Sequence, residues 1–208
     1  MNVVSIDEDS VSGELHSPDR ADGRGLVLTH GAGGNCRTPL LVEVAKACCA
    51  RGLHVLRCDL PFRQRRRTGP PSPATAAADR EGLRGAVQFL RRRVAGPIFL
   101  GGQSYGGRQA SMLAADDVEI AAALLLLSYP LHPPGQPEKL RTAHFPRLRT
   151  PAVFVHGTSD PFATNAELRA ALALIPSETK LIAVDGAGHD LRRGRFDLAP
   201  TLGALLDR

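Results

Sequence analysis

The sequence predicts a three-layer α/β/α sandwich built on a mostly parallel sheet. Short runs rich in valine, isoleucine and leucine alternate with helical stretches along the chain. These runs have no polar side, as is typical of strands that helices cover on both faces. Alternating strands and helices form parallel sheets through crossover connections. The 208 residues match the size of one domain, so we expect a single domain over residues 1–208.

Apolar runs bounded by glycine, proline or polar turns mark the predicted strands. They cover Gly25–His30, His54–Asp59, Pro97–Gly101, Ala121–Ser128, Pro151–His156 and Lys180–Asp185. Helical patterns between them predict helices over Pro39–Arg51, Ala76–Val94, Tyr105–Ala115, Asn165–Ile175 and Phe196–Leu206. An alternating segment, Ser10–His16, predicts an antiparallel edge strand.

Two proline-rich segments, residues 60–75 and 129–150, are expected to be neither strand nor helix. Each follows the carboxyl end of a predicted strand. Loops at that edge of a parallel sheet form the ligand crevice. Both segments are therefore predicted walls of a site.

The composition excludes several classes of protein. Apolar residues make up 43% and charged residues 23%, which is typical of a globular chain. No stretch approaches the roughly 18 apolar residues that cross a membrane, and the acidic N-terminus does not resemble a signal peptide. The four cysteines lack metal-ligand spacing and are expected to be reduced thiols. We therefore expect a cytoplasmic protein with no membrane partner, metal or cofactor.

The net charge of +5 and a pI near 9.4 raise the question of nucleic-acid binding. Nearly all of the basic residues are arginines, and the three arginine clusters lie far apart in the sequence. Only 4% of residues are aromatic and none is tryptophan, so side chains that could stack on bases are scarce. We expect solvated basic surfaces and no nucleic-acid partner.

The strongest chemical signal is a G-x-S-x-G pattern from Gly102 to Gly106, between a predicted strand and a predicted helix. A turn from strand directly into helix strains the middle residue, and small flanking residues let the two elements approach closely. Such a turn raises the Ser104 hydroxyl above the sheet, beside the free N–H groups of a helix N-terminus. Ser104 is the predicted nucleophile, against the alternative of a glycine-rich turn without chemistry.

A serine hydroxyl needs a base to take its proton and an acid to orient that base. In folds of this type the order along the chain is serine, then acid, then histidine. Asp160 and His189 follow two later strands in that order. They are the predicted acid and base, and Asp185 is the rival acid.

The segment from His30 to Gly34 supplies the third element, because acyl chemistry needs two N–H donors for an oxyanion. Tyr105, after the nucleophile, is one predicted donor. Ala32 is the other, and its neighbour Gly33 is both the alternative donor and a predicted substrate-binding residue. The loop lacks the Lys-Ser/Thr of a phosphate-binding loop. His30 is expected to form structural hydrogen bonds.

These motifs resemble a small lidless subgroup of the α/β-hydrolase superfamily. Members of the subgroup are similar to dienelactone hydrolases and to the hydrolase-like domain of a subunit of a chromatin-acetylating complex. The resemblance rests on residues 30–34, 101–108, 128–135 and 156–162. It implies an eight-stranded core trimmed at its N-terminal edge, no cap domain and a Ser-His-Asp triad. Dienelactone hydrolases use a cysteine nucleophile where this chain has Ser104.

The expected function is hydrolysis of a small ester or thioester through an acyl-enzyme intermediate. Arg63 and Arg66, in the basic loop after the second predicted strand, are candidates to contact an anionic group of the substrate, and the alternative is a solvated loop without this role. The alternative is a catalytically idle scaffold that binds a protein partner. We expect a monomer or a homodimer.

Overall fold

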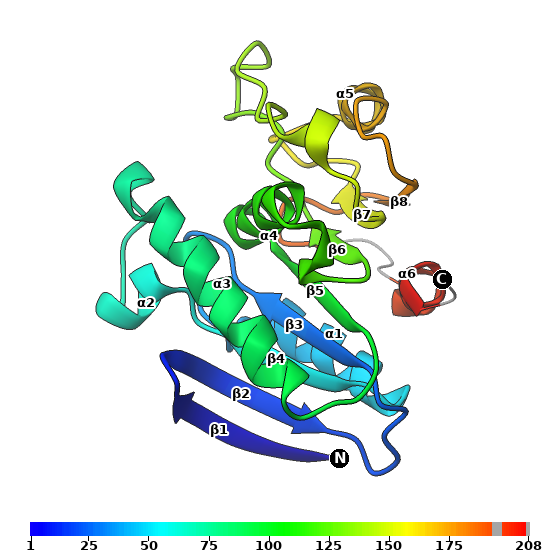
Figure 1. Cartoon of the computed structure of the whole chain (residues 1–208). Coiled ribbons are helices and arrows are strands. Elements are labelled where there is room, and N and C mark those ends of the chain that lie inside the picture. The colour runs from blue at the N-terminus through cyan, green and yellow to red at the C-terminus, as the bar shows by residue number, and fades with distance from the viewer. Residues whose placement is uncertain (193–196, 207–208) are drawn as a thin grey trace.

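The computed structural model describes residues 1–192 and 197–206. Within them, eight strands form one sheet in the order β1-β2-β4-β3-β5-β6-β7-β8 (Figure 1). Neighbouring strands from β4 to β8 in this order pair in parallel. The β2 strand pairs antiparallel with both of its neighbours, β1 and β4. The strands are β1 (Asn2–Glu8), β2 (Val11–Ser17), β3 (Gly25–Thr29), β4 (His54–Cys58), β5 (Ile98–Gln103), β6 (Leu124–Leu127), β7 (Ala152–Gly157) and β8 (Thr179–Val184).

Helices cover both faces of the sheet, which confirms the predicted three layers. One face packs against α1 (Pro39–Ala50) and α6 (Leu198–Leu206). The other packs against α2 (Pro61–Arg65), α3 (Ala76–Arg91), α4 (Tyr105–Asp116) and α5 (Asn165–Leu172). Within the described residues, no cap domain covers the carboxyl edge of the parallel strands.

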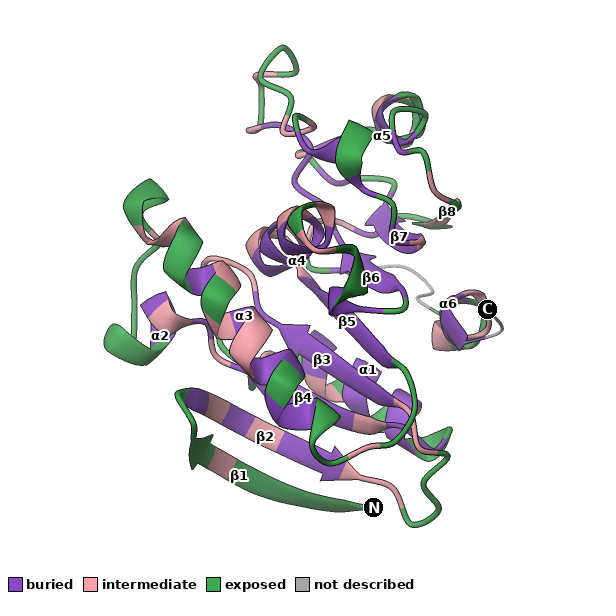
Figure 2. Ribbon diagram, in the orientation of Figure 1, coloured by how far each residue is buried: buried purple, intermediate pink, exposed green. Residues whose placement is uncertain are grey.

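The two helical layers explain why the central strands are apolar on both sides. In β3, Leu26 and Leu28 face the α1 layer while Val27 faces the α3 layer, and all three are fully buried. Figure 2 shows the same burial along β3, β5 and β6. A strand enclosed in this way has no solvent side on which a polar residue could lie.

The N-terminal edge corrects one expectation, because the sheet is not trimmed there. The predicted edge strand is β2, and β1 adds a further strand beyond it through a seven-residue antiparallel ladder. Asp9 and Ser10 form the connecting turn with φ of 52° and 64°, the geometry of a type I′ hairpin. Nearly all of β1 is exposed, so its sequence has no alternating apolar pattern that could have revealed it.

The basic segment after β4 corrects a second expectation, because residues 60–75 contain α2 and a 3₁₀ turn, Pro73–Thr75. Likewise, the predicted loop 129–150 contains a 3₁₀ turn, Phe145–Arg147. The α2 helix is too short to show helical periodicity. It forms because the buried Asp79 carboxylate on α3 accepts a hydrogen bond from Phe62 N at 3.0 Å, at the start of α2.

The other predicted elements are confirmed, with ends that differ by a few residues. The start of β6, the end of α3 and the end of α5 each differ by three residues, and a 3₁₀ turn, Val118–Ile120, precedes β6. Phe196, the predicted start of the last helix, lies outside the described residues, and α6 begins at Leu198. No helix in the described chain is long and apolar enough to cross a membrane.

A buried polar cluster joins β2 to β4. Arg57 is 2% exposed, and its Nε donates to His16 Nε2 at 2.8 Å. The same guanidinium pairs with Glu14 and donates to the carbonyl of Cys36. His16 is therefore neutral in the fold, because burial, and secondly the charge of Arg57, lower its pKa to about 4.

This cluster predicts a loss of stability in mild acid. Between pH 6.5 and 4 the unfolded chain protonates His16 while the folded chain does not, so the free energy of unfolding falls as the pH falls. His16→Gln should flatten this dependence by about 1 kcal/mol per pH unit. Urea unfolding at pH 7, 6 and 5 measures it, and an identical slope in both proteins would refute the assignment.

Candidate active site

Ser104 lies in a strained turn between β5 and α4. Its φ of 51° and ψ of −116° lie where non-glycine residues are rare and cost about 1–3 kcal/mol. Two backbone hydrogen bonds hold the turn: Ser104 N donates to Leu127 O at 2.8 Å, and Arg108 N donates to Ser104 O at 2.9 Å. This backbone conformation places the Ser104 side chain at the carboxyl edge of the sheet.

The glycines on either side of Ser104 are needed for close packing. A Cβ at Gly102 would lie 2.8 Å from Thr29 O, and one at Gly106 would lie 2.5 Å from His30 O. Both distances are shorter than any real contact of this kind. The turn therefore packs directly against the end of β3, which brings the loop after β3 next to Ser104.

The structure brings Ser104, His189 and Asp160 together in one chain of hydrogen bonds. His189 Nε2 is 2.8 Å from Ser104 Oγ, and His189 Nδ1 is 2.8 Å from Asp160 Oδ2. The Asp160 side chain is fully buried, and its other oxygen accepts from Phe162 N at 2.9 Å. Asp185, the rival acid, is exposed. The geometry supports Asp160 over Asp185 as the partner of His189.

Phe162 is a site residue that the sequence analysis missed. Its ring stacks on the His189 imidazole, with centroids 4.1 Å apart and planes at 30°. Together with Asp160, this contact restricts how the imidazole can turn. Phe162 follows Asp160 by two residues, but no spacing signal indicates that its ring folds onto a histidine from another loop.

The two predicted oxyanion donors, Tyr105 and Ala32, line the same cleft as Ser104. Tyr105 begins α4, so its N–H has no partner inside the helix. Ala32 lies in the loop after β3, and its N–H donates to no acceptor within the described residues. A Cβ at Gly31 would be 3.4 Å from the Ser104 Cβ, so this loop passes close to the serine. Both N–H groups are therefore available near Ser104.

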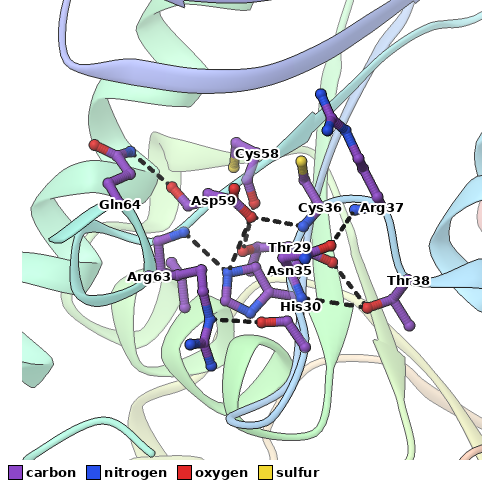
Figure 3. A network of polar contacts seen from close by, with 12 residues as sticks. Thr29, His30, Asn35, Cys36, Arg37, Thr38, Cys58, Asp59, Arg63 and Gln64 are labelled. Atoms are coloured by element: carbon purple, nitrogen blue, oxygen red, sulfur yellow. Dashed lines mark hydrogen bonds and ion pairs between the residues drawn. The ribbon is translucent and has the colours of Figure 1, made fainter. Parts of the chain in front are cut away.

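The Arg63 side chain lies near His30 and binds the loop after β3 (Figure 3). It is 6% exposed. Its guanidinium donates to four backbone carbonyls, those of Gly34, Ala32, Arg66 and Gly69, at 2.8 to 3.1 Å. These bonds fix the orientation of the Ala32 carbonyl, and therefore of the peptide group between Ala32 and Gly33. The structure thus gives Arg63 contacts to the backbone where the sequence analysis predicted contact with a substrate.

His30 forms structural hydrogen bonds at the base of the same loop, as expected. It is fully buried and lies beside Asp59 (Figure 3). Its Nε2 accepts from Leu60 N at 3.2 Å, and its Nδ1 lies 2.8 Å from Gly31 O. Burial is the main cause that lowers the pKa of His30. A neutral imidazole with Nδ1–H as donor satisfies both contacts.

An open cleft of about 510 Å³ lies in front of Ser104. Neither Gly33, Arg63 nor Arg66 lines it: Gly33 and Arg66 are exposed, and Arg66 donates to Pro70 O at 2.6 Å. The cleft is lined by Ala32, Pro70, Pro71, Ser72, Pro73, Ala76, Ser104, Tyr105, Arg108, Gln109, Pro130, Arg141 and Phe162. The two arginines in this wall are not the two that the sequence analysis selected.

The side chain of Tyr105 anchors the start of α4 to α3. Its hydroxyl donates to Asp79 Oδ2 at 2.7 Å, and its ring meets Phe62 edge-on at 5.7 Å. Burial, and secondly the bond to Asp79, raise the pKa of Tyr105. Asp79 thus connects α2, α3 and the turn that carries Ser104. The sequence analysis did not predict this role of Asp79.

A second serine–histidine pair is enclosed in the core. Ser111 Oγ lies 2.8 Å from His144 Nε2, and both residues are buried. Burial, and secondly the charge of Arg108, lower the pKa of His144 to about 4. Neither residue lines the cleft, and no carboxylate bonds to this histidine within the described chain, so the pair lacks the features found at Ser104.

Several solved structures of hydrolases are similar in fold to this chain. A lidless α/β serine hydrolase, XC6422 from Xanthomonas campestris, is 17% identical over 97% of this chain and 91% of its own, with a TM-score of 0.76. A dienelactone hydrolase from Anabaena variabilis is 24% identical over 99% and 94%, with a TM-score of 0.70. Est1E from Butyrivibrio proteoclasticus, solved with ferulic acid, is 17% identical over 98% and 96%, with a TM-score of 0.76.

At these identities the solved structures establish similarity of fold. The match at the level of sequence comes from a family model, described as an alpha/beta hydrolase domain, which aligns with residues 22–198. That range includes Ser104, Asp160 and His189 and most of the chain. The resemblance seen in the motifs is thereby confirmed, and the chain belongs to the α/β-hydrolase domain family.

Proposed function

We propose that this chain is a serine hydrolase that cleaves a small ester or thioester through an acyl-enzyme intermediate. The observation that carries the proposal is the unbroken chain of hydrogen bonds from Ser104 through His189 to Asp160, at the edge of an open cleft. Each residue has the chemistry that its place requires: a nucleophile, a base and an acid that orients the base.

In the first half of the reaction, His189 Nε2 accepts the hydroxyl proton as Ser104 Oγ bonds to the substrate carbonyl carbon. The N–H groups of Tyr105 and Ala32 donate to the oxygen that becomes negative. Asp160 stabilises the imidazolium through Nδ1–H. The proton then passes to the leaving alcohol or thiol as its bond to the acyl carbon breaks. Water repeats these steps on the acyl-enzyme and releases the acid.

The shape of the cleft supports small substrates. Its wall comes from loops, from the start of α3 and from the first turns of α4, and no cap encloses it within the described residues. A volume of about 510 Å³ accommodates a ligand of modest size. Open access also suits a reaction in which water must reach the acyl-enzyme.

Replacing the nucleophile tests the proposal. Ser104→Ala should abolish labelling by a fluorophosphonate probe and lower kcat for p-nitrophenyl acetate by about 10⁴- to 10⁶-fold, since the triad acts as a unit. Ser111→Ala is the matched control, because that serine also meets a histidine but lies in the core. This variant should retain labelling.

Two results would overturn the assignment. Equal labelling of the wild type and Ser104→Ala would show that another residue reacts with the probe. A folded wild type that neither labels nor turns over any ester would favour the alternative function, an idle scaffold that binds a protein partner. Circular dichroism establishes that each protein is folded.

Replacing the two candidate acids separately tests the role of Asp160. Asp160→Asn should lower kcat by about 10⁴-fold, because an amide cannot hold His189 in the tautomer that accepts the serine proton. Asp185→Asn should leave kcat within about twofold, since Asp185 is exposed. Steady-state kinetics with p-nitrophenyl acetate measures both, and the reverse pattern would make Asp185 the acid.

A further inference from the structure

Two arginines in the cleft wall lack an acidic partner. Arg108 lies on α4, one helical turn after Ser104, and Arg141 lies in the segment between β6 and β7. No ion pair to either residue is formed within the described part of the chain. The Arg108 guanidinium makes no hydrogen bond there either, and its Nε is buried. Arg141 Nη1 donates to Pro130 O at 3.2 Å.

Arg108 and Arg141 line the same cleft, so their positive charges repel each other. Burial, and secondly the positive charge of Arg108, lower the pKa of Arg141. Arginine stays protonated in proteins, so the repulsion is not relieved by loss of a proton. A negative charge bound between them would relieve it.

Gln109 provides a third donor at the same wall. Its side chain is fully buried, and Oε1 accepts from Arg80 Nη1 at 3.1 Å. That bond assigns the opposite side of the amide to Nε2, which is buried and has no acceptor within the described residues. Buried donors without partners are uncommon in proteins, and Gln109 lines the cleft, so a group bound there could accept this hydrogen bond.

The rest of the wall is largely apolar. Pro70, Pro71, Pro73 and Ala76 form the side contributed by the loop after α2 and by the start of α3. An apolar surface beside a cationic one suits a short hydrocarbon chain with a charged end. Ser104 lies in the same cleft, so such a molecule can reach the serine and the cations at once.

From these observations we propose that the substrate carries an anionic group, a carboxylate or a phosphate, which Arg108, Arg141 and Gln109 bind while the ester meets Ser104. This inference rests on the proposed hydrolase function and names its substrate class. Guanidinium groups bind such oxygens through paired, charge-assisted hydrogen bonds. Anion recognition thus lies in the wall formed by α4 and the segment after β6.

A binding experiment tests the anion site without turnover. Isothermal titration of Ser104→Ala with monomethyl adipate, dimethyl adipate and inorganic phosphate compares an anionic ester, its neutral counterpart and a free anion. We expect monomethyl adipate to bind at least tenfold more tightly than dimethyl adipate, because only it offers a charged end. Tighter binding of phosphate than of monomethyl adipate would identify the anion as a phosphate.

Substitutions assign the binding to the two arginines. Adding Arg108→Gln or Arg141→Gln to Ser104→Ala should weaken monomethyl adipate binding about 10- to 100-fold, the value of a charge-assisted hydrogen bond. Adding Arg149→Gln is the matched control. It removes the same charge from an exposed residue just before β7, at the opposite edge of the sheet, and should leave binding unchanged.

A kinetic experiment connects the site to catalysis. The p-nitrophenyl monoester of adipic acid and p-nitrophenyl 6-methylheptanoate share a leaving group and a chain length but differ in the charge of the acyl end. Arg108→Gln should lower kcat/KM for the first about 10- to 100-fold and leave that for the second within threefold. Arg149→Gln should change neither.

The outcomes separate this inference from the proposed function. Binding of monomethyl adipate that depends on Arg108, with no turnover by the wild type, would support the anion site and reject the hydrolase. Turnover of both esters at equal kcat/KM, with equal binding of the two adipates, would reject the anion site and keep the hydrolase. If Arg108→Gln does not fold, Arg141→Gln gives the same reading.

Discussion

The backbone of Ser104 is the constraint on which the site depends. A left-handed residue between β5 and α4 is tolerable only because its neighbours have no side chains to obstruct the packing: Gly102 meets the end of β3, and so does Gly106. The same contact that relieves steric conflict brings the loop after β3 beside the serine. The strained backbone of Ser104, the close packing on β3 and the position of the oxyanion donors therefore depend on one another. A change in any of them would alter the others.

Two buried charged residues make the surrounding loops rigid. Arg63 donates to four carbonyls around the loop after β3, and Asp79 accepts from the start of α2 and from Tyr105. Loops at this edge lack the hydrogen-bond ladders of regular structure. Each of these side chains forms several hydrogen bonds to loop groups that such a ladder would otherwise pair. These bonds are strong because one partner is charged. Both act behind the cleft and leave its wall free for a ligand.

The arginine-rich composition conceals three different kinds of arginine. Most of those in the described residues are exposed, as expected for solvated basic surfaces. Arg57 and Arg63 are buried and satisfied by protein oxygens and by His16. Arg108 and Arg141 line the cleft without an acidic partner among the described residues, which is why they can serve recognition. All of these arginines carry the same charge, and they differ in how many hydrogen-bond acceptors of the protein lie near them.

The sequence by itself determined the alternation of strands and helices, the serine turn, and the order of Ser104, Asp160 and His189, because these follow from local patterns and from the edge at which parallel strands end. It did not determine β1, which is exposed on both faces, or α2, which forms against Asp79 on another helix. Nor did it separate Arg63 from Arg108. Both follow the end of a strand by five residues, and only the folded structure places Arg63 on the carbonyls of the loop after β3 and Arg108 in the wall of the cleft. Tertiary structure decided these roles because each depends on contacts, or on the lack of them, with residues outside the local segment.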